Sequence, residues 1–491
     1  MGNIRIRTDC DMRPRLRFLS DELIGRILDE AYKLLDTKGV TLPHEALLAR
    51  LADAGCRVDA ESKRVQMPRE VVEAAVRSAP SRIELWNIAG ESCCDLSGDK
   101  VHFTPGSAAI KILDSNTCRM RHVSTDDLLR YAKLVERLDA IDYSSTALVP
   151  NDVPKAIGDS IRLYALLKTT SKAIVTGAFT IPGFEVMAKM LLAVRGTRDA
   201  LREKPFTIFS CCPTSPLKWS TTTADNTARC AELGVPVEFI AMPLAGLVSP
   251  ISLVGCVIQH AVETLSGIVI SQTTRPGAPI LYGGSPGVFD MRTMAATISP
   301  VEAQLMDCAY IEVGKHLGLP TQAYIGMSDS KTLDAQAGFE SGGGLYLAGL
   351  AGVNSVSGPG MHYFESCLSL EKLVFDAEIC AMTRRLVAGL EPRDDFPADA
   401  LFDELLREKT LLTADHTLKY FHQEHYIPGP LIDRTQLQGL GSGTQDLMQR
   451  ARDEVARHLA QYQPPEVLSP EQRRDMEGVM NAAAGSFKIG F

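Results

Sequence analysis

Apolar residues recur along this chain in two alternating patterns, short continuous runs and longer stretches with helical spacing. Eight short runs are rich in apolar or β-branched residues: Val101–Thr104, Tyr143–Val149, Ala173–Phe179, Phe206–Cys211, Val237–Ala241, Pro279–Tyr282, Gln322–Ile325 and Val353–Val356. Helical spacing lies beside them at Thr125–Leu138, Asp152–Leu167, Thr221–Leu233, Ser252–Gln272, Pro300–Leu317 and Leu333–Leu350. Buried strands that alternate with helices predict a parallel sheet and an α/β fold.

The number of strand–helix units favours one α/β architecture. Eight units in about 260 residues are what a (β/α)8 TIM barrel requires. The alternative is an open doubly wound sheet, which usually carries a glycine-rich phosphate loop after its first strand. Here the first run is followed by Pro105-Gly106-Ser107, without a G-x-G-x-x-G motif. We therefore favour the barrel and keep the open sheet as the alternative.

The flanking segments have a different pattern and predict two further parts. Residues 1–100 are expected to form an N-terminal α/β cap, mostly helical, before a catalytic barrel at 101–390 and a C-terminal helical extension at 391–491. The expected cap elements are helices at Leu23–Leu34, Pro43–Ala54 and Pro68–Ser78 and strands at Ile83–Trp86 and Cys94–Leu96. The extension is expected to contain helices at Ala400–Leu412 and Gln445–Tyr462, with a loop at 429–443.

Composition excludes some classes of function. The net charge of −9 argues against a surface for nucleic acid or an anionic membrane. Residues 1–17 are polar and lack the apolar run of a secretory signal, and the apolar stretch Leu253–Ile270 is interrupted by polar residues, so it reads as a buried helix. The 12 cysteines include no C-x-x-C, which favours reduced thiols in the cytoplasm.

Small residues dominate the segments that follow the predicted strands. In a barrel, the catalytic site lies at these carboxyl ends. Where side chains are small, a large planar group can approach the backbone closely. The predicted contacts with such a group are Gly106, Ser107, Gly284, Ser285, Gly358 and Gly360.

The same segments carry aromatic residues and few charges. Ring faces hold a quaternary ammonium, and a cation or hydrogen-bond donor holds a carboxylate, so the site suits a trimethylammonium carboxylate. The predicted substrate contacts are Phe103, Tyr282, Phe289, Arg292, Tyr324, His362 and Phe364. Any of these residues has an ordinary alternative role in packing, and His362 can satisfy a backbone carbonyl.

No residue is assigned a catalytic role, and no metal ligand is predicted. Asp329 and Glu365 are predicted to position the substrate, although Asp329 can instead cap the next helix. Cys211-Cys212 lacks a neighbouring third ligand for zinc. Lys331 as a Schiff-base lysine would need apolar burial, and its neighbours are polar.

Two runs in the last third of the barrel carry a resemblance to a known family. Residues 328–340, with the sequence SDSKTLDAQAGFE, resemble the SDSK-x-x-D-x-QA-x-[YF]-E stretch of the trimethylamine methyltransferase family. Residues 364–379, with the sequence FESCLSLEKLVFDAEI, are similar to its ESGL-x-x-S-x-E-x-LV-x-D-x-EI pattern. His416-Thr417-Leu418 and Asp433-Arg434 match shorter signatures, and the similarity spans nearly the whole chain. Cys367 stands where relatives often have Gly, and Met361-His362 replaces smaller residues.

The resemblance implies an enzyme that moves a methyl group from a methylated amine to Co(I) of a separate corrinoid protein. Archaeal trimethylamine enzymes of the family carry pyrrolysine, whereas this sequence has only standard residues and looks like the non-pyrrolysine branch, which demethylates quaternary amines. The chain has no D-x-H-x-x-G loop to ligate cobalt, so the cobalamin cofactor would come with the partner.

A quaternary nitrogen also needs less help from the protein. It already carries the activating charge and leaves as a neutral amine, so positioning and desolvation suffice. Glycine betaine is the favoured substrate, with proline betaine or carnitine next. The alternatives are a betaine- or corrinoid-binding barrel without turnover and a lyase or aldolase that uses Lys331. A homo-oligomer is expected, as is common for large barrels.

Overall fold

The computed structural model describes residues 13–436 and 445–491, and it begins with the predicted cap. Helices α1 (Asp21–Thr37), α2 (Glu45–Asp53) and α3 (Arg69–Ser78) surround a small antiparallel sheet of β1 (Val40–Thr41), β2 (Arg57–Asp59) and β3 (Arg64–Gln66). Helix α1 begins where the Ser20 side chain accepts a hydrogen bond from the Leu23 amide, and it buries the face that contains Ile24, Ile27 and Leu28. The three cap helices lie where the spacing predicts them.

All eight predicted barrel strands are present, each within or beside its predicted run. They are β6 (His102–Thr104), β9 (Ser144–Ser145), β10 (Ile174–Thr176), β11 (Thr207–Cys211), β12 (Val237–Phe239), β14 (Ile280–Leu281), β17 (Gln322–Tyr324) and β18 (Ser355–Ser357). Five pair in parallel in the order β14-β12-β11-β10-β9, and three in the order β17-β18-β6. The parallel α/β class is therefore confirmed.

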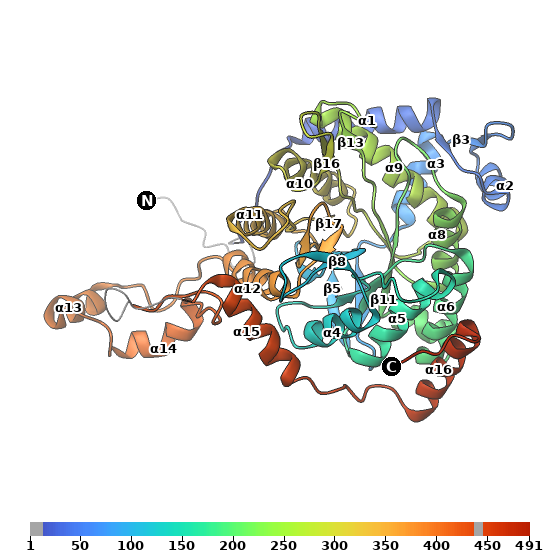
Figure 1. Cartoon of the computed structure of the whole chain (residues 1–491). Helices are drawn as coiled ribbons and strands as arrows, with labels where there is room; N and C mark the ends of the chain where they lie inside the picture. The colour runs from blue at the N-terminus through green and yellow to red at the C-terminus, as the bar shows by residue number, and fades with distance from the viewer. Residues whose placement is uncertain (1–12, 437–444) are drawn as a thin grey trace.

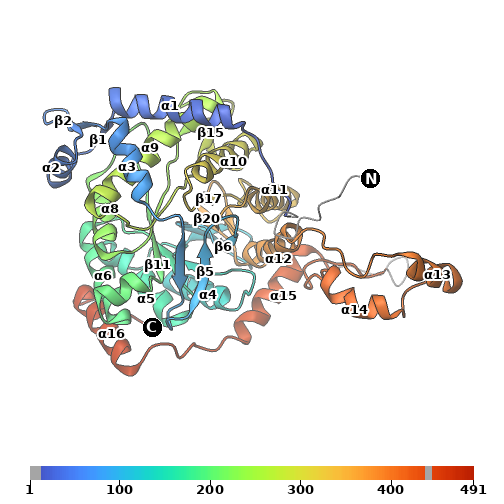
Figure 2. The same cartoon turned by 180° about the vertical axis from the view of Figure 1, so that it is seen from behind.

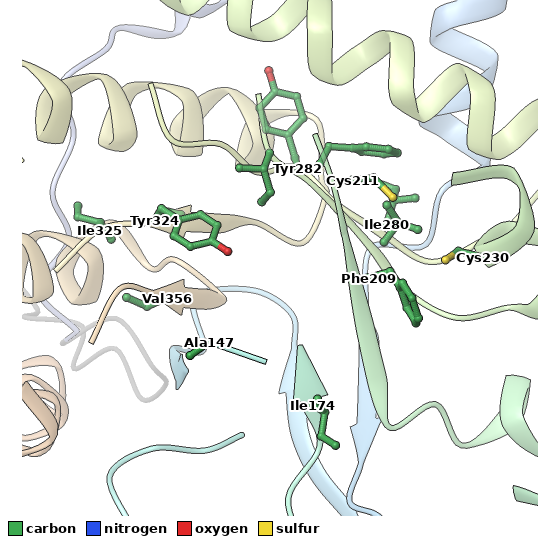
Figure 3. Packing of buried hydrophobic residues seen from close by; sticks show 14 of the residues in the cluster. Ala147, Ile174, Phe209, Cys211, Cys230, Ile280, Tyr282, Tyr324, Ile325 and Val356 are labelled. Atoms are coloured by element: carbon green, nitrogen blue, oxygen red, sulfur yellow. The ribbon is translucent and has the colours of Figure 1, made fainter. Parts of the chain in front are cut away.

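Backbone contacts connect these two parallel sheets to one another. Tyr282, beside β14, forms a parallel bridge with Thr321, beside β17. At the other edge, the amide of Asp142, before β9, donates to the Phe103 carbonyl of β6 at 2.9 Å. Figure 3 shows side chains from both sheets, among them Tyr324, Val356 and Phe209, within the buried core.

The helices that follow the strands extend the prediction. They are α4 (Thr125–Glu136), α5 (Gly158–Thr169), α6 (Ile181–Arg195), α7 (Arg198–Glu203), α8 (Thr221–Leu233), α9 (Leu253–Thr274), α10 (Val301–His316), α11 (Ala335–Ala351) and α12 (Leu370–Val387). Six match predicted stretches, whereas α6, α7 and α12 were not predicted. Helix α6 is apolar on most of its faces and has Pro182 in its first turn, so it lacks a clear amphipathic period.

Helix α9 is long and apolar enough to span a membrane by length and composition. However, 72% of its most apolar window is buried inside the protein. It packs against α1, α3, α8 and α10, and its polar side chains His260, Glu263 and Gln272 are buried with it. It is therefore a core helix of this fold, as its polar interruptions predict.

Short strands that the sequence did not predict form two mixed sheets beyond the carboxyl ends of the eight parallel strands. One sheet contains β19 (Met361–His362), β20 (Cys367–Leu368), β7 (Lys111–Leu113) and β8 (Met120–His122). Another contains β13 (Leu244–Ala245), β15 (Gly287–Asp290) and β16 (Ala295–Thr297). These strands are two to four residues long, too short to show a period of two in the sequence.

A hairpin covers the amino ends of the parallel strands. Strands β4 (Ile83–Trp86) and β5 (Ser92–Leu96) pair in antiparallel fashion. The Trp86 and Ile88 amides donate to the carbonyls of Pro205 and Ser171, just before β11 and β10. The hairpin buries Ile83, Leu85 and Leu96 against residues of the parallel strands. This end of the sheet is thereby closed by apolar packing.

The C-terminal extension has two separate parts. Helices α13 (Asp399–Glu408) and α14 (Asp415–Glu424) project from the body as an arm (Figure 1), and the view from behind shows the same separation (Figure 2). Helices α15 (Leu447–Ala460) and α16 (Pro470–Ala484) return to the body and pack on α12 and α6. The helices α13 and α15 were predicted and α14 and α16 were not. Part of the predicted loop at 429–443 and the first 12 residues lie outside the described residues, and the domain boundaries at 100 and 390 stay a prediction.

Candidate functional site

A buried acidic residue stands in the middle of a parallel strand. Glu238 of β12 is 0% exposed, and the Ser210 hydroxyl from β11 donates to its Oε1 at 2.6 Å. Its other oxygen, Oε2, has no hydrogen-bond partner among the described residues. Burial raises the pKa of Glu238 to about 7, because desolvation penalises the charged form. Such a carboxyl is uncommon in a core unless a ligand uses it.

A second carboxyl, Glu365, feels the charge of the first. Burial and then the charge of Glu238 raise the pKa of Glu365 to about 8. Its backbone is strained, since Tyr363, Phe364 and Glu365 have consecutive φ values of 50°, 54° and 63°. Each such residue costs on the order of 1 kcal/mol outside glycine. The strained turn holds Glu365 near Glu238, and the pair prefers to retain protons near neutral pH.

Tyr324 and Cys212 lie beside these two carboxyls. Tyr324 of β17 is 4% exposed and hydrogen-bonds the Ser107 side chain. Its pKa lies well above the ordinary value because of burial and then the charges of Glu365 and Glu238. Cys212, after β11, is accessible to solvent, yet burial raises the pKa of its thiol. Both the solvent accessibility and the raised pKa are explained by a thiol that protein surrounds on most sides and that is open on one side, as in a concave pocket.

A buried arginine adds the opposite charge. Arg162 of α5 is 1% exposed, and it donates to the Thr146 carbonyl and, at 3.0 Å, to the Thr146 hydroxyl. The Phe179 ring lies 5.1 Å from its guanidinium carbon. Burial lowers the pKa of Arg162 to about 10, so it stays charged at neutral pH. Its Nε and Nη1 atoms have no partner among the described residues, which leaves donors free for an anion.

A large pocket opens at the carboxyl side of β15 and β17, with a volume of about 960 Å³. Phe289 and Phe364 are its aromatic lining residues. Its charged lining residues are Asp290, Arg292, Glu302, Asp329, Lys331, Asp334 and Glu340. This pocket is more highly charged than the sequence analysis expected, because α10 and the turn before α11 contribute side chains that do not follow a strand directly.

Asp329 is fixed within the wall of this pocket. Its carboxylate accepts hydrogen bonds from the amides of Ile298 and Ser299, and the closest contact is 3.1 Å. Burial raises the pKa of Asp329 to about 6. Glu340 accepts from the Ser328 hydroxyl at 2.6 Å and from the Asp329 amide at 2.9 Å. The SDSK run thus forms an internally bonded turn, and the cap of α11 is Asp334 rather than Asp329.

Four of the predicted site residues lie around the large pocket. Asp329, Phe289, Arg292 and Phe364 line it. Arg292 is 90% exposed at its side chain and pairs with Asp290 at 3.0 Å. Tyr324 and Glu365 instead lie with Glu238. The predicted residues therefore fall into two neighbouring groups linked by the turn Phe364-Glu365.

Three predicted substrate contacts are buried within the protein. Phe103, Tyr282 and His362 are each 0% exposed. Tyr282 packs against His260, with 5.5 Å between ring centroids, and the Arg384 guanidinium lies 5.4 Å from the Phe103 ring. Burial lowers the pKa of His362 to about 3, so its ring is neutral, and neither ring nitrogen has a partner among the described residues. Their role toward a substrate stays a prediction.

The small residues predicted to contact a planar group are mostly enclosed. A Cβ on Gly106 would lie 2.2 Å from the Met361 side chain, and one on Gly284 would lie 2.2 Å from His260. Gly358 and Gly360 have φ values of 146° and 89°, and Ser285 is 1% exposed. Internal packing thus accounts for these positions, whereas Ser107 is partly accessible and touches Tyr324.

Glu238, Arg162 and Cys212 were not predicted as site residues. Glu238 had a signal in the sequence, because it is the single charged residue in the apolar run Val237–Ala241. Arg162 had none, since one arginine within a helical stretch is ordinary. Cys212 was considered only as a zinc ligand.

Comparison with known proteins places this site in a family. The family model for trimethylamine methyltransferase (MTTB) matches residues 5–481. A "Trimethylamine methyltransferase MttB" of Desulfitobacterium hafniense strain DSM 10664 / DCB-2 is 30% identical over 464 residues, 93% of each chain. A "Glycine betaine methyltransferase" of Desulfitobacterium hafniense strain Y51 is 30% identical over 460 residues, 93% of this chain and 95% of that one.

A solved structure is also similar over most of its length. The crystal structure of the Methanosarcina barkeri monomethylamine methyltransferase is 11% identical, with a TM-score of 0.47, and the match covers 95% of this chain and 93% of that one. The family match and the sequence relatives carry the assignment. The chain belongs to the trimethylamine methyltransferase family and is an enzyme of the transferase class.

Proposed function

We propose that this chain takes a methyl group from a quaternary amine and delivers it to Co(I) of a separate corrinoid protein. Membership of the family supports methyl transfer, and the relative named glycine betaine methyltransferase supports a quaternary substrate. Glycine betaine is the first choice, because it is the smallest quaternary amine that carries a carboxylate. Proline betaine and carnitine follow.

The observation that carries the proposal is a pair of opposite charges in one buried site. The charges of Glu365 and Glu238 act on Tyr324, and Arg162 feels the charge of Asp159 first and then that of Tyr324. A zwitterion has matching parts: its ammonium faces the two carboxyls and the Tyr324 ring, and its carboxylate takes the free donors of Arg162. A simple amine has no use for a buried arginine.

The two carboxyl groups then stabilise the positive charge of the substrate. A bound cation favours their ionised form, so binding lowers their raised pKa values and releases protons. Tyr324 and Cys212 complete the wall, and Ser107 orients the Tyr324 hydroxyl. The leaving group is a neutral tertiary amine, so the protein needs no acid to protonate it. Positioning and exclusion of water remain its tasks.

The corrinoid would arrive with its partner protein. The adjacent pocket of about 960 Å³ is near the upper end of ligand-pocket volumes, so it fits a large group that enters from outside. Phe289, Phe364 and the partly accessible Ser107 are the residues proposed to face it. The bound corrinoid supplies the nucleophilic cobalt, and this chain presents the methyl donor.

We infer that the eight parallel strands form a (β/α)8 barrel. The bridge between Tyr282 and Thr321 and the hydrogen bond from Asp142 to Phe103 support this inference, because they join the two sheets at both edges. The site residues then lie at the carboxyl ends of the strands, where barrel enzymes carry their chemistry.

Product identification with a panel of betaines tests the proposal. Enzyme, a Co(I) corrinoid protein and each betaine are mixed, and the corrinoid absorbance and the N-demethylated amine are followed. Methyl-cobalt and one matching amine are expected. Binding in calorimetry without any product would favour the alternative, a non-catalytic betaine- or corrinoid-binding protein. A lyase that uses Lys331 has less support, because Lys331 is exposed.

The exposed arm is the proposed place for self-association. Its helices carry solvent-exposed apolar side chains, among them Phe402, Leu406 and Leu418, with exposed fractions of 58%, 75% and 69%. Exposed apolar surface of this kind marks interaction sites. A homo-oligomer that loses mass in sedimentation after Phe402→Asp is expected. The cytoplasmic location stays a prediction.

A further inference from the structure

A cysteine, a histidine and an aspartate meet at the amino ends of the parallel strands. Cys94 comes from β5, His102 begins β6, and Asp142 precedes β9. Their ligand atoms all lie within 4.8 Å of one another. Cys94, His102 and Asp142 neither line the large pocket nor bond to Glu238, so the cluster is separate from the site described above.

The orientation of His102 points one nitrogen into the cluster. Its Nε2 lies 3.2 Å from the backbone carbonyl of Asp95, to which it donates. Its Nδ1 is buried, has no hydrogen-bond partner in the part of the chain that the structure describes, and lies 3.5 Å from Asp142 Oδ1. A histidine that binds a metal typically donates its other N–H to a carbonyl or carboxylate in this way.

Asp142 divides its two oxygens between separate partners. Oδ2 accepts from the Phe103 amide at 2.7 Å and from Arg384 at 2.5 Å. Oδ1 faces His102 and has no hydrogen-bond partner among the described residues, so it is free to bind an ion. Arg384 holds the carboxylate through the other oxygen, Oδ2.

We propose that Cys94, His102 and Asp142 bind one Zn²⁺ ion. A thiolate, an imidazole and a carboxylate are ligands that zinc prefers. Zinc–ligand bonds of about 2.0–2.3 Å place ligand atoms about 3–4 Å apart, so small side-chain rotations close the site. A thiolate and a carboxylate neutralise the two charges of the ion, and a water or the neighbouring Cys93 thiol completes the tetrahedron.

The ion would act as a structural link. It joins the β4–β5 hairpin to β6 and to the segment before β9, three parts of the chain that meet only through folding. In barrel enzymes, this end of the strands serves stability, whereas the chemistry lies at the other end. The alternative is a simple ion pair of protonated His102 with Asp142, in which Cys94 has no part.

Cobalt(II) substitution distinguishes a metal site from an ion pair of His102 with Asp142, because a Co(II)–thiolate bond has a characteristic near-ultraviolet charge-transfer absorption. The full chain is freed of metal under reducing conditions and titrated with Co²⁺, and Zn²⁺ is then added as a competitor. We expect about one equivalent of Co²⁺ with the thiolate band, which Zn²⁺ abolishes. Absence of the band from the folded wild-type protein overturns the proposal.

Two variants and a control locate the site. Cys94→Ser is expected to lose the thiolate band, and His102→Asn to weaken Co²⁺ binding by at least about tenfold. Cys118→Ser, an exposed cysteine elsewhere, keeps both. Circular dichroism checks whether each variant is folded. If Cys94→Ser does not fold, the Co²⁺ affinity of His102→Asn tests the proposal instead. A Cys94→Ser protein that keeps the band overturns the assignment.

Discussion

The candidate site and the amino ends of the parallel strands affect the stability of the fold in opposite ways. Around the candidate site, Glu238 and Arg162 are buried with polar atoms that have no partner among the described residues, and the turn at Tyr363–Glu365 is strained. At the amino end, the hairpin packs apolar residues, and Lys172 donates to three backbone carbonyls at 2.7–2.9 Å. Unpaired charge and strain together cost several kcal/mol. They lie where a ligand can compensate for them, and the same holds for His102 Nδ1 of the proposed zinc cluster, which has no partner among the described residues. The strained turn, in contrast, occurs beside the candidate substrate site.

Removing a carboxyl group from the candidate site should have the largest effect on activity. We expect Glu238→Gln and Glu365→Gln each to lower kcat/KM for glycine betaine by about 100-fold, because each loses a charge that stabilises the cationic methyl donor, about 2.7 kcal/mol. Methyl-cobalt formation measures this loss. Glu84→Gln, on β4 at the opposite end, is the matched control. Equal activity in all three variants would show that the acidic pair does not touch the substrate.

The raised pKa of Glu238 should make the wild-type protein less stable as the pH rises. Since burial raises the pKa of Glu238 from its ordinary 4.5 to about 7, the folded state holds a proton that the unfolded state releases. Stability is therefore full below pH 4.5 and falls as the pH rises to about 7. Glu238→Gln does not undergo this loss, so its stability relative to wild type should rise by about 3 kcal/mol between pH 4.5 and pH 8.

Denaturant unfolding at pH 4.5 and pH 8 checks the sign of this effect. Glu84→Gln again serves as control, because Glu84 lies on the hairpin and is partly exposed. If Glu238→Gln is destabilising by the same amount at both pH values, Glu238 is ionised in the free protein, and its Oε2 has a partner other than a proton.

Arg162 separates betaines from amines without a carboxylate. Arg162→Lys keeps a charge but loses the planar fork, so we expect kcat/KM to fall about tenfold for glycine betaine. Choline, which has no carboxylate, should be used no worse by the variant than by wild type. Arg195→Lys, which replaces an arginine that donates to Asn87 and Ile88 carbonyls near the hairpin, is the control. Parallel losses for both substrates would place Arg162 in a packing role.

The fold could be predicted in large part because buried parallel strands leave a continuous apolar signal. Runs such as Phe206–Cys211 and Gln322–Ile325 mark β11 and β17 closely. The short strands of the two mixed sheets could not be predicted, since β13 and β19 contain two residues each and depend on turns and neighbours. Helix α6 was not predicted because most of its residues are apolar, so its sequence shows no clear helical period even though one face is buried.

The candidate site was predictable only where it follows a strand. Tyr324 and Glu365 were selected because they follow from the strand ends and the family motif, and both lie near Glu238. Glu238 itself lies within a strand, a position that the rule for strand ends does not sample. The amino-end cluster has no motif, because positions 94, 102 and 142 show no ligand spacing and meet only through the tertiary fold.

The smallest effect on activity should come from the amino end, and this makes it the sharpest check of the comparison. Removing zinc from the wild-type protein with a chelator should lower Tm by a few degrees, about 2–4 °C for each kcal/mol lost in a chain above 150 residues. The initial rate of methyl transfer at low temperature should change less than twofold, because Cys94, His102 and Asp142 take no part in the proposed substrate site. Cys118→Ser should respond to the chelator as wild type does. A large loss of rate at unchanged Tm would show that the zinc cluster affects the substrate site. The proposal that the amino end only stabilises the fold would then be wrong.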